Sequence, residues 1–309
     1  MASFTCDYVR RMGAEHVRRL DHADRLDVQR LLAEAAHHDG FWPLSDQLIA
    51  DLGAFVHDDD ESRPISVLVS GDSDRLAGYA QASRGSLGWT MQVVVDPAHR
   101  SSSPGIVDQL VGSTLDGIAT AGGGHVDWWL YEPTDDATLQ AAAHGFRFDR
   151  GLLQMRRSLP VDRRAAVATR SFVVGQDEDA WVAVNNRAFA GHAEQGTWTI
   201  DTLRQRMAQP WFDADGFRLH ERDDRLAAFC WTKRHDATTG EIYVIGVDPD
   251  FQGLGLGKEL TLAGLDHLYD DGAADAILFV DGANVGARAM YERLGFAVHR
   301  TDRAFARDV

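Results

Sequence analysis

Apolar positions in the second half of the chain follow two spacings, that of helices and that of strands. Helical spacing over residues 181–189, 200–207, 258–269 and 287–294 predicts four helices, the last of them closed by Gly295 as a C-cap. Five β-rich runs predict strands, and residues 236–240 read as a turn. These runs are residues 217–220, 225–231, 241–247, 276–280 and 296–306. The order predicts a mixed, mostly antiparallel sheet flanked by helices.

The chain repeats itself at an offset of 150 to 152 residues. Residues 75–80, 93–100 and 144–150 match residues 225–230, 245–252 and 294–300 in the same order. Self-similarity at a fixed offset indicates two copies of one fold. The proline and charges of residues 160–167 are typical of an exposed linker, so we expect an N-terminal domain at 1–159 and a C-terminal domain at 168–309.

The amino-acid composition limits the kinds of partner that we expect for this chain. Hydrophobic residues make up 44% and charged residues 25%, enough apolar material for two cores. The net charge of -16, from 47 acidic and 31 basic residues, argues against a nucleic-acid partner, although backbone amides can still hold a small anion. With only Cys6 and Cys230 there is no disulfide framework or metal motif, and Cys230 is interpreted as a core residue. No apolar leader or spanning run is present, so we expect a soluble, cytoplasmic protein, with a monomer as the working assumption.

A glycine-rich turn stands between an apolar strand that ends in Val-Asp-Pro and an amphipathic helix. Its pattern is Gln252-x-x-Gly255-x-Gly257. Glycines let backbone amides approach a pyrophosphate, and the positive end of a helix dipole would stabilise it. Taken alone the pattern fits an ordinary tight turn equally well. It lacks the ending of a P-loop and lies in the middle of the repeat, unlike a dinucleotide-binding turn.

In its full context this pattern resembles the GNAT acetyltransferase superfamily. Val247-Asp-Pro, the glycine turn, Asn284 and Ala287-x-x-Met-Tyr291-x-x-x-Gly-Phe296 occur in that family's order. The resemblance implies two tandem GNAT domains that use acetyl-CoA as a co-substrate, with no permanently bound cofactor and no metal. The residues implied to bind acetyl-CoA in the second domain are Ile245, Gly246, Val247, Gln252, Gly253, Leu254, Gly255, Leu256, Gly257, Lys258, Asn284, Val285, Gly286, Ala287, Arg288 and Ala289.

The resemblance also implies direct transfer of acetyl to an amine. Tyr291 is the expected general acid for the departing thiolate, and Glu241, at the start of the strand beside the thioester, is the expected general base. A core tyrosine and a solvated turn glutamate are the alternative interpretations.

The first copy differs at these catalytic positions. Aligned through the repeat, Trp89 stands for Glu241 and Ala141 for Tyr291, and the loop carries Ser103 and Pro104. We therefore expect no catalysis there. The first domain either binds acetyl-CoA, through Val93, Val94 and Val95, or is a structural partner.

Nearly the whole chain resembles the mycothiol synthase family, which acetylates the cysteinyl amine of cysteinyl-glucosamine-inositol. Residues 186–198, 229–233 and 241–249 carry this likeness. It implies that the acceptor is bound by Asp46, Glu194, Lys233, Glu241 and Phe279. Two of these depart from the family, which usually has a longer glutamate at Asp46 and a tyrosine at Phe279. Two other functions stay open: a tandem GNAT enzyme for another small-molecule or peptide amine, and a non-catalytic acetyl-CoA-binding module.

Overall fold

The computed structural model describes residues 17–53, 64–71, 75–85, 87–100, 105–191 and 195–309, which form two compact units. The first unit comprises Met1–Arg150 with Asp302–Val309, and the second comprises Gly151–Thr301. Each contains a mixed sheet flanked by helices, so the expected fold class is confirmed. No described helix has the length and apolarity needed to cross a membrane.

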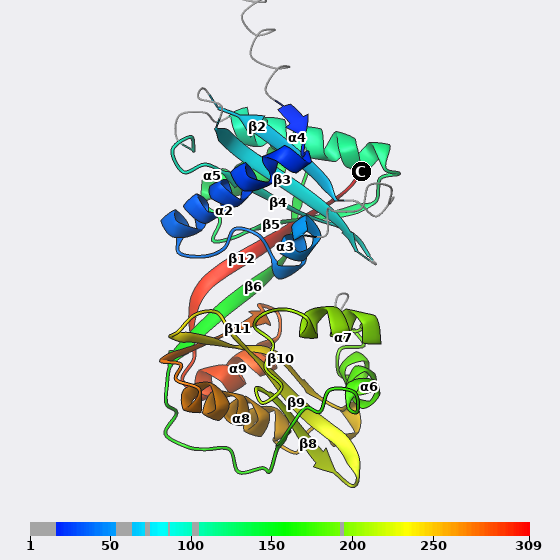
Figure 1. The fold of residues 1–309 in the computed structure, drawn as a ribbon, viewed down its shortest axis with the longest axis vertical. Coiled ribbons are helices and arrows are strands. Elements are labelled where there is room, and N and C mark those ends of the chain that lie inside the picture. The colour runs from blue at the N-terminus through cyan, green and yellow to red at the C-terminus, as the bar shows by residue number, and fades with distance from the viewer. Residues whose placement is uncertain (1–16, 54–63, 72–74, 86, 101–104, 192–194) are drawn as a thin grey trace, which may run out of the picture. The chain divides into compact units, whose positions relative to one another are not determined.

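The sheet of the first unit has the order β1-β2-β3-β4-β5-β12. One of its faces is covered by α2 and α3 through a cluster that includes Val28, Leu31 and Leu48, and the other by α4 through Ile106 and Leu110 (Figure 1). Its elements are β1 (Val17–Arg19), η1 (His22–Asp24), α2 (Arg25–Asp39), α3 (Asp46–Gly53), β2 (Ile65–Ser70), β3 (Leu76–Gly85), β4 (Gly88–Val95), α4 (Gly105–Thr120), β5 (His125–Leu130), α5 (Asp135–Ala143) and part of β12 (Ala297–Asp308).

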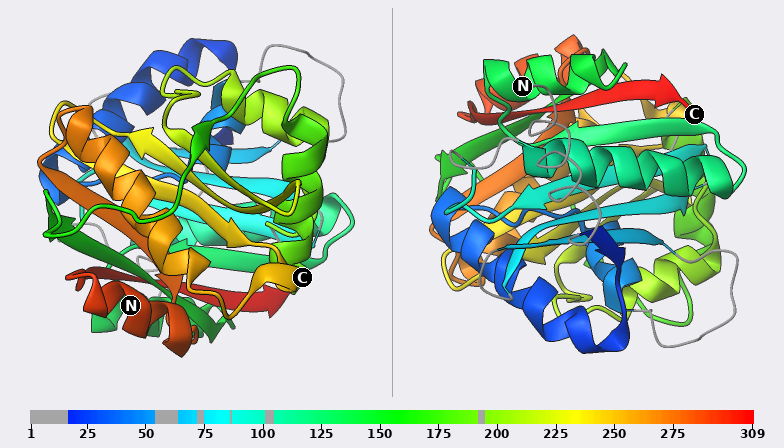
Figure 2. Two further views of the ribbon diagram at one scale, coloured as in Figure 1. Left: turned by 90° about the horizontal axis from the view of Figure 1, so that it is seen from below. Right: turned by 90° about the horizontal axis from the view of Figure 1, so that it is seen from above.

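The sheet of the second unit has the order β6-β11-β10-β9-β8-β7. The helix α8 lies across one face of its strands (Figure 2), and an aromatic cluster that includes Trp181 and Trp231 joins α6 and α7 to the other face. Its elements are β6 (Arg147–Ser158), β7 (Arg170–Ser171), α6 (Glu178–Ala188), α7 (Ile200–Met207), β8 (Phe217–Arg222), β9 (Arg225–Arg234), β10 (Thr239–Val247), η2 (Pro249–Phe251), α8 (Leu256–Asp270), β11 (Asp275–Asp281) and α9 (Val285–Arg293). The helices and strands expected from the apolar spacing are all present, and Gly295 follows α9 with a φ of 84°.

In each unit, the strand at one end of the sheet order comes from the other copy of the repeat: β12 in the first unit and β6 in the second. Residues 303–308 of β12 pair with β5 in the first unit, and residues 152–158 of β6 pair with β11 in the second. The units therefore differ from the expected domains at 1–159 and 168–309. The repeat itself carries no signal for this exchange, because either strand satisfies the pattern of either sheet.

The parallel pair in each sheet parts before its strands end. In the second unit the ladder joins Thr239 to Asp275 and stops at Ile242–Leu278, whereas β10 continues to Val247. In the first unit the β4–β5 ladder stops at Met91–Trp128. Beyond these points β10 and β4 still pair with β9 and β3, but their other edge has no strand partner and can pair with an extended ligand.

A β-bulge distinguishes β10 from its counterpart β4. The register of β9 and β10 shifts between Ile242 and Val244, so Tyr243 is an extra residue, whereas β3 and β4 pair without a shift. Counted back from the shared Val-Asp-Pro, this insertion places Thr90 at the position of Glu241. The alignment of Glu241 with Trp89 was wrong for that reason.

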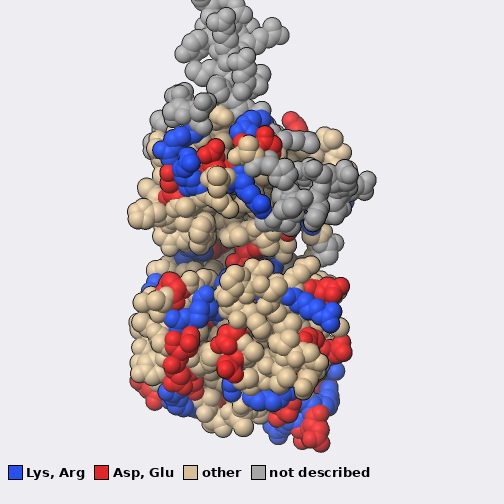
Figure 3. Space-filling model, viewed as in Figure 1, with Lys and Arg blue, Asp and Glu red and all other residues tan. Residues whose placement is uncertain are grey.

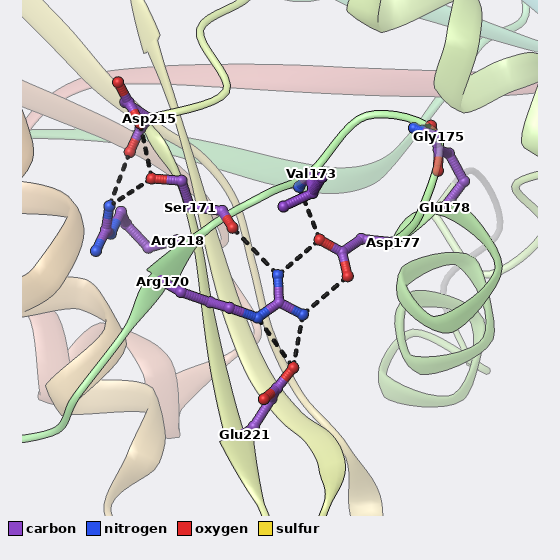
Figure 4. A network of polar contacts seen from close by, with 9 residues as sticks. All are labelled: Arg170, Ser171, Val173, Gly175, Asp177, Glu178, Asp215, Arg218 and Glu221. Carbon is purple, nitrogen blue, oxygen red and sulfur yellow. Dashed lines mark hydrogen bonds and ion pairs between the residues drawn. The ribbon is translucent and has the colours of Figure 1, made fainter.

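An ion-pair network around the buried carboxylate of Asp177 connects the elements at the start of the second unit (Figure 4). The guanidinium of Arg170 on β7 bonds both carboxylate oxygens of Asp177, at 2.6 and 2.8 Å, and also reaches Glu221 on β8. Asp177 also accepts the amide of Val173, and Arg170 holds the pKa of its carboxyl below the ordinary range. This network connects β7, β8 and the start of α6, and its role is structural.

Candidate active site

A pocket of about 420 Å³ opens at the end of β10 in the second unit. It is lined by Val247, Phe251, Gln252, Gly253, Gly255, Leu256, Gly257, Lys258, Met290 and Arg293. Seven of these ten belong to the expected acetyl-CoA site. The pocket lies directly beyond the point where β10 and β11 have parted.

The N-cap residue of α8 has no side chain that bonds the first backbone amides of the helix. Gly253 and Gly255 both have a φ of 78°, a left-handed conformation that favours glycine, and Gly255 is the N-cap without a side-chain hydrogen bond. The first amides of an α-helix have no partner within the helix, and its dipole adds positive potential there. Neither Gly253 nor Gly255 has any other atom within 4 Å of the place of a Cβ. The turn therefore leaves these amides open to an anion.

Three pocket residues were missed by the sequence prediction, namely Phe251, Met290 and Arg293. Met290 and Arg293 are three residues apart on α9, so they share one helical face. The exposed side chains of Arg293 and Lys258 add two cations to the pocket. The sequence did hold a signal for Arg293, because it is a basic residue one helical turn after Met290 on the same predicted helix.

Tyr291 belongs to the core cluster under α8 and α9. It is 6% exposed and packs edge-on against Phe296, with ring centroids 5.9 Å apart. Burial raises the pKa of its phenol, so the hydroxyl keeps its proton at neutral pH. Cys230 lies in the same cluster, and burial raises the pKa of its thiol to about 12, which confirms it as a core residue.

Glu241 and Lys233 form a cross-strand pair on the face opposite α8. The bulge sets this sidedness, because Ile242, Ile245 and Val247 pack in the α8 cluster, whereas Tyr243 and Val244 join the aromatic cluster. Both charged residues are buried, at 5% and 7% exposure of the whole residue. Buried charges of this kind require polar partners or a polar ligand.

Aromatic rings and a histidine surround this pair. The Lys233 ammonium lies 5.0 Å from the Trp211 ring centre and 5.6 Å from that of Tyr243, close enough for cation–π attraction. Glu241 Oε2 lies 2.6 Å from His235 Nε2. The site thus presents a carboxylate and an ammonium against half-buried rings, an arrangement suited to a polar amine.

The other expected residues are placed differently. Asn284 caps α9 by accepting the amide of Ala287 at 3.1 Å, and the pocket reaches α9 through its second half and not through residues 284–289. Phe279 lies on β11 between the core residues Leu278 and Val280, so its side chain lies on the opposite face of the sheet. The Arg300 guanidinium lies 6.0 Å from its ring centre. Asp46 begins α3 of the first unit, and Glu194 lies outside the described residues.

The first unit carries a different residue at the position of Tyr291. Ala141 takes the place of Tyr291, since Phe146 donates to its carbonyl as Phe296 does to that of Tyr291. Val93, Val94 and Val95 lie on β4, but the Val95 carbonyl accepts a hydrogen bond from Arg100, whose guanidinium Asp39 also holds at 2.6 and 2.7 Å. Ser103 and Pro104 lie outside the described residues.

Comparison with known proteins agrees with this geometry. The model of the acetyltransferase (GNAT) family matches residues 175–296. The mycothiol acetyltransferase of Thermomonospora curvata is 43% identical over 280 residues, covering 88% of this chain and 90% of that protein, and the one of Streptomyces coelicolor is 41% identical, covering 89% of each.

Solved structures share the fold at low identity. A GCN5-related N-acetyltransferase from Sphaerobacter thermophilus has a TM-score of 0.74 at 21% identity, covering 94% of this chain and 95% of that one. A tandem GNAT protein from the clavulanic acid biosynthesis pathway has a TM-score of 0.68 at 16% identity, covering 94% and 98%. The identities above 40% over nearly the full length decide the family: the chain belongs to the mycothiol acetyltransferases, which are acyltransferases of the GNAT type.

Proposed function

We propose that the second unit transfers the acetyl group of acetyl-CoA to the cysteinyl amine of cysteinyl-glucosamine-inositol, the step that completes mycothiol. The observation that carries this proposal is the layout of β10. Its Val247 end borders the pocket, and its other end presents the buried Glu241. Val247 is six positions after Glu241, a distance of about 20 Å along an extended strand, which leaves room for a long, extended thioester.

Acetyl-CoA is the substrate expected at the pocket. The amides at the start of α8, with Lys258 and Arg293, would hold its phosphates, and the stretch of β10 between Ile242 and Val247, which pairs with β9 but no longer with β11, would bind its pantetheine arm. The proposal includes Ile245 and Gly246 in that stretch.

The chemistry requires the α-ammonium to lose two protons on its way to an amide and the thiolate to gain one. With an ordinary pKa of about 8, the ammonium releases the first proton to water and becomes a neutral amine. The amine nitrogen then bonds to the carbonyl carbon and gives its second proton to Glu241, the bond from carbon to sulfur breaks, and Tyr291 donates its proton to the thiolate and regains one from water. A buried phenol with a raised pKa remains protonated until that moment.

The acceptor's sugar and inositol carry many hydroxyl groups, for which charged side chains are suitable partners. Lys233, fixed above the rings of Trp211 and Tyr243, would bind them next to Glu241. Phe279, Asp46 and Glu194 stay predictions as acceptor contacts. A phenylalanine at position 279 offers ring packing without a hydroxyl.

The experiment is an incubation of the protein with acetyl-CoA and cysteinyl-glucosamine-inositol, followed by mass spectrometry of the acceptor. We expect a product heavier by one acetyl group and a matching release of CoA thiol. Glu241→Gln should lose most of this activity. Acetylation of a different amine alone would reject this acceptor, and acetyl-CoA binding without any turnover would identify a non-catalytic module.

A further inference from the structure

His235 links the buried carboxylate of Glu241 to the molecular surface. The distance from its Nε2 to Glu241 Oε2 is 2.6 Å. The side chain of Glu241 is 7% exposed, whereas that of His235 is 33% exposed. No sequence motif singled out His235, and the expected mechanism makes no use of it.

The hairpin between β9 and β10 fixes the position of His235. Its amide donates to the Thr239 carbonyl at 3.0 Å. Asp236 accepts the amides of Thr238 and Thr239 at 2.7 and 2.8 Å, and these bonds lower the pKa of its carboxyl to about 2. Arg234 donates to two carbonyls of the same loop. The imidazole therefore projects from a turn that is held by seven hydrogen bonds of its own.

The bond to His235 engages only one oxygen of Glu241. A carboxylate has two, so Oε1 stays available for an amine or a bridging water while Oε2 is held. On the neighbouring strand Lys233 faces the rings of Trp211 and Tyr243, and on β11 the residue paired with Glu241 is the apolar Ile277. His235 is thus the group that sets the orientation of the carboxylate from the solvent side.

We propose that His235 is a positioning residue for acetyl transfer, holding Glu241 through Oε2 so that Oε1 receives the proton of the acceptor amine. The inference rests on the proposed function, since it needs an amine acceptor beside Glu241. In this step the N–H bond of the amine breaks and an O–H bond forms at Oε1. The Nε2–H of His235 stays bonded to Oε2, and the carboxyl later releases the proton to water.

The test is a double-mutant cycle on kcat with His235→Ala, Glu241→Gln and the double variant. Glu241→Gln should lower kcat by roughly 10² to 10⁴, the usual contribution of a general base. His235→Ala should lower it about 10- to 100-fold, the effect of a misplaced catalytic group, with the KM for acetyl-CoA unchanged. In the Glu241→Gln background, His235→Ala should change kcat by less than about twofold, because no base is left to position.

A conservative variant separates positioning from proton transfer through the ring. His235→Gln places an amide N–H close to the original Nε2, so it should keep most of the kcat that His235→Ala loses. His220→Ala is the matched control. Its ring bonds the Ala168 carbonyl at 2.9 Å on β8, and its kcat should equal that of the wild type.

Two results would overturn the proposal: an equal loss from His235→Ala in both backgrounds, or a His235→Gln variant as slow as His235→Ala. Failure of the proposed function looks different. Wild-type protein would then leave cysteinyl-glucosamine-inositol unmodified, and the same cycle measured on the amine that it does acetylate would still decide the role of His235.

Discussion

Close packing of α8 on the sheet depends on a glycine with no room for a side chain. A Cβ added at Gly264 would lie 2.5 Å from Cys230 Sγ and 2.7 Å from Ile242 Cδ1. Both of these partners are buried, and Ile242 adjoins the bulge, so neither can move away freely. Gly264→Ala must therefore push α8 away from β9 and β10.

The size of the effect follows from two opposing terms. Overpacking a core costs about 1–3 kcal/mol, and contacts this short with two buried partners place the cost near the upper end. Replacing a helical glycine by alanine returns about 1 kcal/mol. We expect a net loss of about 1–2 kcal/mol in the free energy of unfolding, and weaker acetyl-CoA binding because α8 carries the pocket.

Gly112 on α4 provides the matched control. A Cβ there meets no atom within 4 Å, so Gly112→Ala should raise the free energy of unfolding by up to about 1 kcal/mol. Urea unfolding, with calorimetric titration of acetyl-CoA, measures both variants. A Gly264→Ala protein as stable as the wild type, with full acetyl-CoA affinity, would refute the packing argument.

Three further outcomes are expected. Tyr291→Phe should lower kcat roughly 100-fold while the KM for acetyl-CoA stays constant in steady-state assays, since only the acid is lost. An unchanged kcat would remove Tyr291 from the mechanism. Lys233→Met should raise the KM of the acceptor and leave that of acetyl-CoA unchanged; equal effects on both would contradict its place in the acceptor site. Asp177→Asn should destabilise the protein at neutral pH. Because Arg170 depresses the pKa of Asp177 below its ordinary value of 3.8, that stabilisation is present above this value and is lost as the pH falls through the lower, folded-state pKa. Urea unfolding at pH 7 and at pH 3 should show the gap to the wild type shrinking in acid, and a constant gap would argue against the ion pair.

Local pattern was sufficient for the elements and for the presence of a glycine turn before α8. The apolar spacing of residues 200–207 matches α7 to the residue, and the glycines at 253 and 255 adopt a left-handed backbone. These features depend on neighbours within a few positions, so the sequence carries them directly.

Features that are set by pairing between distant strands could not be predicted from the local sequence pattern. The inserted Tyr243 becomes visible only when β10 is laid against β9, and it shifts the alignment of the two copies by one residue. The exchange of β6 and β12 depends on which strand edge each one meets. The hydrogen bond between His235 and Glu241 spans the β9–β10 hairpin, and the sequence alone does not specify the shape of that hairpin.

Charge on the surface fits a small-molecule enzyme. Over the face drawn in Figure 3, acidic and basic side chains are interspersed and no broad basic patch gathers among the coloured residues. The cations that matter for an anionic substrate are instead placed locally, at Lys258 and Arg293.

The selectivity of the enzyme for its acceptor tests the proposed function most directly. The ratio of kcat/KM for cysteinyl-glucosamine-inositol to that for free cysteine, both with acetyl-CoA, compares the same amine with and without the pseudo-disaccharide. The account predicts a ratio far above one that collapses in Lys233→Met, since the sugar and inositol bind beside Glu241. A ratio near one, or acetylation of free cysteine alone, would contradict it.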